Sequence, residues 1–231
     1  MRCGRMEKPS VFHRILLNKH WRIYKKLPMK GIFITFEGSE GCGKSTQSRL
    51  LYEYLKRKGY NVVYLREPGG NKISEKIRKI LLDPNNHISP ICETLLYMGA
   101  RAEVVDKIIR PALSKGQIVI CDRFLDSTFA YQGYGLGIDI GFIKRVGNFV
   151  TAGIKPDLTI LLDLPIKKGL KHRESKKDRI EKRSLQYHLA VRKGYLKLAS
   201  QDAKRIKIVK VDKDRNKTQL KIREIIEKYV L

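Results

Sequence analysis

The chain has 231 residues, a length that suits one large domain or two small ones. Hydrophobic residues make up 42% of it and charged residues 31%, which excludes a disordered or fibrous protein. No apolar run approaches the roughly 20 residues that a membrane-spanning helix needs, so no membrane partner is expected. The four cysteines lack the spacing of a zinc site or a disulfide framework, and a cytoplasmic protein with reduced thiols is expected.

The net charge of +26 favours a polyanionic partner when it is taken alone. Its distribution is uneven, because the net charge is +7 over residues 1–28, +5 over residues 29–163 and +14 over residues 164–231. The motifs that carry chemistry lie mostly in the nearly balanced middle, and no nucleic-acid recognition motif accompanies the basic ends. We therefore expect no specific nucleic-acid partner.

Residues 1–28 differ from the rest of the chain. This basic stretch lacks the continuous apolar core and the small-residue cleavage site of a secretory signal. We expect a disordered basic extension, or upstream sequence that a mis-assigned start has added, with Met29 as the true first residue. Residues 29–231 are then one domain.

From residue 31 onwards, short apolar strands alternate with helical segments. Strands rich in β-branched residues are predicted at 31–37, 61–66, 117–121, 157–163 and 205–211. Helices with one apolar face are predicted at 45–58, at 72–82, from Pro90 towards 110 after a Ser89 cap, and near the C-terminus. This alternation predicts an α/β fold with a five-stranded parallel sheet and helices on both faces. Ligands of such sheets bind at the carboxyl ends of the strands.

A phosphate-binding loop follows the first predicted strand. The residues GSEGCGKS at 38–45 match the pattern G-x-x-x-x-G-K-[ST], with the required strand before them and helix after them. The glycines let successive backbone N–H groups converge on a phosphate at the helix N-terminus. Lys44 supplies a cation for the phosphates, and the Ser45 hydroxyl can ligate Mg²⁺. The residues predicted to bind the nucleoside triphosphate are Gly38, Ser39, Glu40, Gly41, Cys42, Gly43, Lys44, Ser45 and Thr46.

Three further strands end in charged residues. The second strand runs into REPGG at 66–70, the third ends in Asp122 and Arg123, and the fourth ends in Asp163. Exposed loop charges are common, so one such strand end alone would indicate little. Three together at the edge that carries the phosphate-binding loop predict an active site there.

These motifs resemble those of the bacterial thymidylate kinases. TFEGSEGCGKSTQ, REPGG, the DRF and AYQG motifs within 122–133, and DRIE at 178–181 occur in the order and at the separations of that family, over about residues 30–228. The resemblance implies a P-loop kinase fold with a short mobile lid at about 171–180, and a kinase domain at 29–231. It also implies transfer of the γ-phosphoryl group of ATP to dTMP, a Mg²⁺ cofactor and a homodimer.

The resemblance also assigns roles to individual residues. The fork-shaped guanidinium of Arg66 suits the dTMP phosphate, and Tyr97 and Arg101 share one helical face towards the base. The implied dTMP-binding residues are Glu40, Arg66, Pro68, Tyr97, Arg101, Arg123, Thr128 and Gln132. The implied metal ligands are Ser45 and, through water, Asp122. The implied catalytic residues are Lys44, Asp122, Arg123, Arg173 and Arg179.

The last two arginines are expected to act from the lid. The variable positions of the phosphate-binding loop contain no arginine, and the resemblance implies that family members of this kind supply the cation over the transferred phosphate from the lid. The resemblance is incomplete at Gly135-Leu136-Gly137, where the family has an arginine between the glycines. Two alternatives stay open: a kinase for another nucleoside monophosphate, and a P-loop ATPase that binds nucleic acid through its basic ends.

Overall fold

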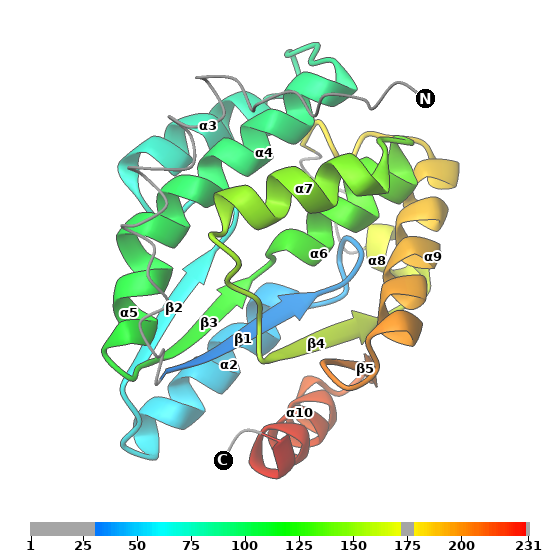
Figure 1. The fold of residues 1–231 in the computed structure, drawn as a ribbon. Helices are drawn as coiled ribbons and strands as arrows, with labels where there is room; N and C mark the ends of the chain where they lie inside the picture. The colour runs from blue at the N-terminus through cyan, green and yellow to red at the C-terminus, as the bar shows by residue number, and fades with distance from the viewer. Residues whose placement is uncertain (1–30, 172–177, 230–231) are drawn as a thin grey trace, which may run out of the picture.

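The computed structural model, which describes residues 31–171 and 178–229, is built on one parallel β-sheet (Figure 1). The strands are β1 (Ile32–Glu37), β2 (Val62–Arg66), β3 (Ile118–Asp122), β4 (Leu158–Asp163) and β5 (Ile206–Lys210). Their order in the sheet is β2-β3-β1-β4-β5, and every neighbouring pair is parallel. The predicted five-stranded α/β fold is confirmed, with each strand within about two residues of its expected bounds.

Helices cover both faces of the sheet (Figure 1). They are α2 (Lys44–Arg57), α3 (Lys72–Leu82), α4 (Pro90–Val104), α5 (Arg110–Ser114), α6 (Leu125–Thr128), α7 (Ile140–Val150), α8 (Ile166–Lys171), α9 (Leu185–Gln201) and α10 (Arg215–Tyr229). Successive strand residues point to opposite faces, so each strand contributes to two cores. In β1, Ile34 belongs to a buried cluster with Leu51 of α2 and Ile222 of α10, whereas Phe33 belongs to one with Val104 of α4.

The helix that begins at Pro90 is less regular than predicted. It was expected to continue towards residue 110, but α4 ends at Val104 and a π-helical turn, Val105–Ile109, separates it from α5. Pro111 has no N–H group to donate to the carbonyl four residues earlier, which disfavours a regular α-helix through this point. Helices α6, α7, α8 and α9 were not predicted from the sequence.

The sheet positions the functional edge of the molecule. Because all five strands are parallel, the turns after β1, β2 and β3 meet at one edge. Within the described residues, no helix has the length and apolar character needed to cross a bilayer. The predicted boundary at residues 28 and 29 lies outside the described residues.

Candidate active site

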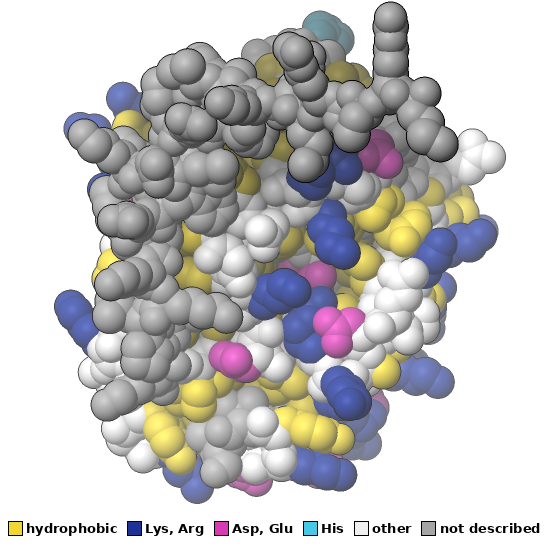
Figure 2. Space-filling model, in the orientation of Figure 1, with side chains coloured by type: hydrophobic (Ala, Val, Ile, Leu, Met, Phe, Trp, Pro, Cys, Tyr) yellow, Lys and Arg dark blue, Asp and Glu magenta, His cyan; other side chains and the backbone are white. Residues whose placement is uncertain are grey.

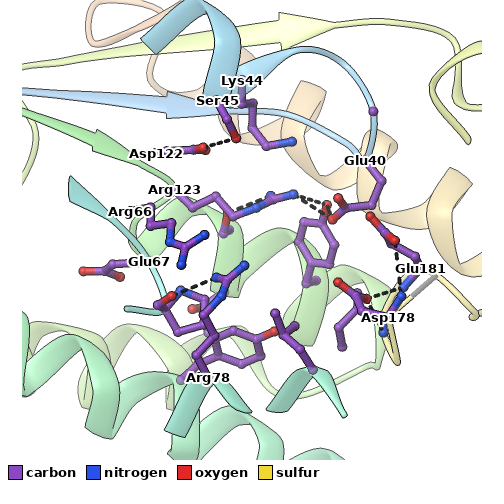
Figure 3. A pocket seen from close by; sticks show the side chains of 18 of the residues that line it. Glu40, Lys44, Ser45, Arg66, Glu67, Arg78, Asp122, Arg123, Asp178 and Glu181 are labelled. Carbon is purple, nitrogen blue, oxygen red and sulfur yellow. Dashed lines mark hydrogen bonds and ion pairs between the residues drawn. The ribbon is translucent and has the colours of Figure 1, made fainter. Parts of the chain in front are cut away.

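A cavity of about 670 Å³ opens at this edge of the sheet (Figure 3). One side is formed by the phosphate-binding loop and the start of α2, and the other by the turns after β2 and β3 together with α3 and α4. The predicted site residues that line it are Glu40, Gly41, Gly43, Lys44, Ser45, Thr46, Arg66, Pro68, Tyr97, Arg101, Asp122, Arg123, Thr128 and Gln132. The structure therefore brings together residues that are far apart in the sequence.

The phosphate-binding loop leaves the N-terminus of α2 open. Gly43 precedes the helix in a left-handed conformation with φ of 88°, and no side chain caps the first N–H groups. By contrast, side chains cap α3, α4, α7 and α9. At Gly41 a Cβ atom would lie 1.9 Å from the carbonyl oxygen of Gly169 in α8, so only glycine fits there. An uncapped helix start with convergent N–H groups is a ready anion site.

Three of the predicted residues of this loop do not line the cavity. The carbonyl oxygen of Ser39 accepts a hydrogen bond of 2.7 Å from Lys44 Nζ, and the carbonyl oxygen of Gly38 accepts one from Arg123. The Cys42 side chain is buried in the apolar core beneath the loop. These residues shape the loop rather than face the cavity.

Lys44, Ser45 and Asp122 form the polar centre of this side (Figure 3). Ser45 Oγ donates a hydrogen bond of 2.5 Å to Asp122 Oδ2 across the gap between α2 and β3. A hydroxyl and a carboxylate side by side are hard oxygen donors of the kind that Mg²⁺ accepts. No cluster of three or more His, Cys, Asp or Glu side chains suited to a metal occurs in the described part of the chain. A magnesium ion that keeps water and phosphate ligands fits such a sparse donor set.

Arg123 lies between this centre and the opposite wall. Its guanidinium forms an ion pair of 2.7 Å with Glu40, and its Nη2 also donates a hydrogen bond of 3.0 Å to the Tyr131 hydroxyl. That hydroxyl in turn donates a hydrogen bond of 2.6 Å to Glu40 Oε1. Burial lowers the pKa of Arg123, but Glu40 acting together with Tyr131, Tyr195 and Asp122 outweighs burial, so the net shift of the pKa is upward. The backbone of Arg123 has φ of 74°, a strained conformation for a residue with a Cβ atom. The turn therefore holds a charged guanidinium at a fixed place in the cavity.

A buried carboxylate that the sequence did not single out supports this turn. Glu37, at the end of β1, accepts hydrogen bonds from the Phe124 N–H, from Ser127 Oγ and from Tyr195 Oη at 2.6–2.8 Å. Both hydroxyls also lie 3.2 Å from Arg123 Nη1. Burial raises the pKa of Glu37 to about 7, and the charge of Asp126 acts in the same direction.

The opposite wall carries several arginines. Arg101 is almost fully buried and donates to Glu67 at 2.7 Å, to Thr128 at 2.9 Å and to the carbonyl oxygen of Phe124 at 3.0 Å. Arg66 is half exposed and lies 3.5 Å from Glu75. Arg78 of α3, which the sequence analysis missed, donates to the carbonyl oxygen of Pro68 at 2.8 Å and also lines the cavity. The periodic spacing of residues along α3 gives no sign that Arg78 will contact the turn after β2.

The predicted base-binding residues Tyr97 and Gln132 lie in the same region. Tyr97 is half-buried, and burial together with the charge of Glu93 raises the pKa of its hydroxyl, so the ring stays neutral. Gln132 Nε2 donates a hydrogen bond of 2.9 Å to Glu93 Oε1. Glu93 itself is fully buried in the first turn of α4 and was not singled out in the sequence.

The two predicted lid arginines have different outcomes. Arg173 lies outside the described residues. Arg179 is described, but its guanidinium pairs with Glu93 at 2.6 Å, its Nε donates to the carbonyl oxygen of Leu81, and it does not line the cavity. Asp163, expected at the same edge, instead forms two hydrogen bonds with Arg192 of α9, at 2.7 and 2.9 Å.

The fold and the cavity define a P-loop nucleotide kinase: a parallel α/β sheet with a phosphate-binding loop on one side of a cavity and arginines on the other. The sequence profile of the thymidylate kinase family matches residues 36–222. The chain therefore belongs to the thymidylate kinase family.

Individual relatives agree with this assignment. The chain is 46% identical to a thymidylate kinase of Thermoanaerobacter sp. (strain X514) over 203 residues, which are 87% of this chain and 100% of that protein. It is 50% identical to one of Caldanaerobacter subterraneus over 171 residues, 74% of this chain and 82% of that protein. The crystal structure of a thymidylate kinase from Ehrlichia chaffeensis is similar, with a TM-score of 0.72 and 34% identity, over 85% of this chain and 98% of that chain.

Proposed function

We propose that this chain transfers the γ-phosphoryl group of ATP to dTMP, which gives ADP and dTDP for deoxyribonucleotide synthesis. One observation carries the proposal: a single cavity offers two separate positions suited to phosphate. The uncapped start of α2 with Lys44 is one, and Arg66 on the opposite wall, with Arg123 between the two, is the other. An enzyme that only hydrolyses ATP has no use for the second site, whereas a nucleotide kinase needs it for the acceptor phosphate.

The reaction needs no covalent enzyme intermediate. An oxygen of the dTMP phosphate attacks the γ-phosphorus of ATP, the bond from that phosphorus to the bridging oxygen breaks, and ADP leaves. The protein must align the two phosphates and neutralise their charge. In the proposal Lys44 contacts the ATP phosphates, and Arg123 lies between donor and acceptor. Ser45 and Asp122, the latter through water, would hold Mg²⁺, which supplies charge neutralisation at the phosphate oxygens.

The opposite side of the cavity is proposed to hold dTMP. Arg66 binds its phosphate, while Tyr97 stacks on the base beside Arg101, Thr128 and Gln132. Glu40, fixed by Arg123 and Tyr131, faces the sugar. The cation over the transferred phosphate is proposed to come from the lid, with Arg173 as the candidate, because the Arg179 charge is already paired with Glu93.

A homodimer is the proposed assembly, in the cytoplasm. Helices α4 and α7 lie side by side (Figure 1). Both carry large exposed apolar side chains, with Ile91 and Leu95 four residues apart on α4 and Phe149 on α7. Sedimentation at several concentrations tests this: we expect a dimer for the intact chain, and a monomer for the variant Leu95→Glu.

No specific nucleic-acid partner is proposed. On the face drawn in Figure 2, Lys and Arg side chains lie at several separate places, and acidic side chains lie among the central ones. Binding that weakens steeply with salt and accelerates ATP hydrolysis would contradict this.

An acceptor panel tests the proposed reaction. ADP release is followed with ATP, Mg²⁺ and one of dTMP, dUMP, UMP, CMP, AMP, GMP or thymidine. We expect dTMP to be the best acceptor and thymidine, which has no phosphate for Arg66, to be inert. Equal rates with several monophosphates would instead indicate a broader nucleotide kinase.

A further inference from the structure

We propose that Glu93 sets the choice of base by fixing the orientation of the Gln132 amide, a step that rests on the proposed function. Gln132 lines the cavity, whereas Glu93 lies behind it and does not. Glu93 is fully buried, and its Oε1 accepts the hydrogen bond of 2.9 Å from Gln132 Nε2. The pair joins α4 to the π-helical turn Phe129–Gly135.

Two guanidinium groups contact the Glu93 side chain. Its Oε2 lies 2.6 Å from the guanidinium groups of both Arg179 and Arg183. A carboxylate with two guanidinium partners offers only acceptors to Gln132. If the amide turned over, its carbonyl oxygen would face a carboxylate oxygen at hydrogen-bond distance, and two buried acceptors in contact repel each other. The amide nitrogen of Gln132 is therefore fixed towards Glu93. The amide oxygen of Gln132 accepts no hydrogen bond from the residues that the structure describes.

A fixed amide distinguishes bases by their N3 position. Thymine and uracil carry a hydrogen on N3, with carbonyl oxygens on either side, and so offer a donor to a fixed amide oxygen. Cytosine offers a lone pair at N3 and an amino group at C4, so the same amide oxygen meets an acceptor. Sites that leave buried polar groups unpaired reject the wrong ligand strongly. Glu93 thereby acts as a positioning residue for selectivity against cytosine without touching the substrate.

The same carboxylate connects the base site to the segment that follows residue 177. Arg179 and Arg183 both precede α9 and reach Glu93 from the chain that follows residue 177. Arg183 also lies over the Tyr187 ring at 4.6 Å, which anchors it to α9. Arg183 thus offers a matched control, because its removal weakens the ion-pair cluster while the contact between Glu93 and Gln132 remains.

The test compares three acceptors that share phosphate and sugar. Values of kcat/KM for dTMP, dUMP and dCMP are measured on the intact chain and on Glu93→Gln, whose amide can either donate to or accept from Gln132. We expect the dTMP-to-dCMP ratio to fall about tenfold or more, and the dTMP-to-dUMP ratio to change less than about twofold. Arg183→Gln should keep both ratios while losing stability. Glu93→Asp keeps the charge but, being one methylene shorter, moves the carboxylate oxygen away from Gln132. This variant replaces Glu93→Gln if the latter does not fold, and the same fall in the dTMP-to-dCMP ratio is expected.

Two results overturn the proposal. One is an unchanged dTMP-to-dCMP ratio in both Glu93 variants, since a merely structural role lowers kcat/KM for all acceptors together. The other is an equal fall of this ratio in Arg183→Gln, since that variant keeps the contact between Glu93 and Gln132. Equilibrium dialysis measures the dissociation constants of dTMP and dCMP, and their ratio gives the same selectivity without turnover. If the intact chain binds dTMP selectively but transfers no phosphoryl group, the proposed function fails while the assignment of Glu93 is still decided by the binding ratio.

Discussion

The buried carboxylate of Glu37 makes the stability of the fold depend on pH. It is completely inaccessible to solvent, and burial raises its pKa from 4.5 to about 7. The folded protein therefore keeps this proton up to about pH 7, whereas the unfolded chain loses it near pH 4.5. Because the folded state binds more protons in this interval, the free energy of unfolding should fall as the pH rises through it.

The size of the effect follows from the two pKa values. One pKa unit corresponds to about 1.4 kcal/mol, so the shift from 4.5 to about 7 amounts to about 3 kcal/mol at high pH. The contribution is fully present below pH 4.5 and is lost above pH 7. The variant Glu37→Gln cannot titrate. The difference in unfolding free energy between the intact chain and this variant should therefore fall by about 3 kcal/mol between pH 4 and pH 8.

Urea denaturation at a series of pH values measures this difference. The variant Glu227→Gln removes an exposed carboxylate in α10 and serves as the control for the loss of one surface charge. If the difference between the intact chain and Glu37→Gln stays constant from pH 4 to pH 8, Glu37 ionises in the folded state as it does in water. The reasoning about its burial would then be wrong.

Three further predictions concern other parts of the site. Lys44→Ala should slow phosphoryl transfer by about 10²-fold or more in a protein that still folds, and an unchanged rate of ADP release would exclude Lys44 from the reaction. Gly41→Ala should weaken ATP binding in a titration, because its Cβ would lie 1.9 Å from the Gly169 oxygen. At Gly99 in α4 a Cβ would meet open space, so Gly99→Ala should raise the free energy of unfolding by about 1 kcal/mol. Arg101→Ala leaves the Glu67 carboxylate buried without its cation and should cost about 3–5 kcal/mol in urea denaturation; a loss below about 1 kcal/mol would contradict the role of this ion pair.

The sequence was most informative where local pattern determines structure. Runs such as Ile32–Glu37 are too short and too β-branched for helices, and the glycine pattern at 38–45 has one well-understood conformation. These two signals placed the sheet, the phosphate-binding loop and the edge that carries the cavity. They also placed Lys44 and Ser45 correctly relative to Asp122, because parallel strands end at one edge.

The support behind the site could not be predicted in the same way. Glu37 contacts Tyr195, which is 158 residues away, and Glu93 contacts Arg183, which is 90 residues away. No local pattern marks a carboxylate that will be buried between distant elements. The π-helical turn at 105–109 likewise depends on how the chain accommodates Pro111 between two packed segments.

Transfer of labelled phosphate tests the central claim most directly. The intact chain is mixed with ATP labelled at the γ-phosphorus, Mg²⁺ and dTMP, and the products are separated. The account predicts that the label appears in dTDP, that it does so only when dTMP is present, and that Arg123→Ala abolishes most of this transfer. Label released as inorganic phosphate at a rate that ignores dTMP and rises with DNA or RNA would contradict it.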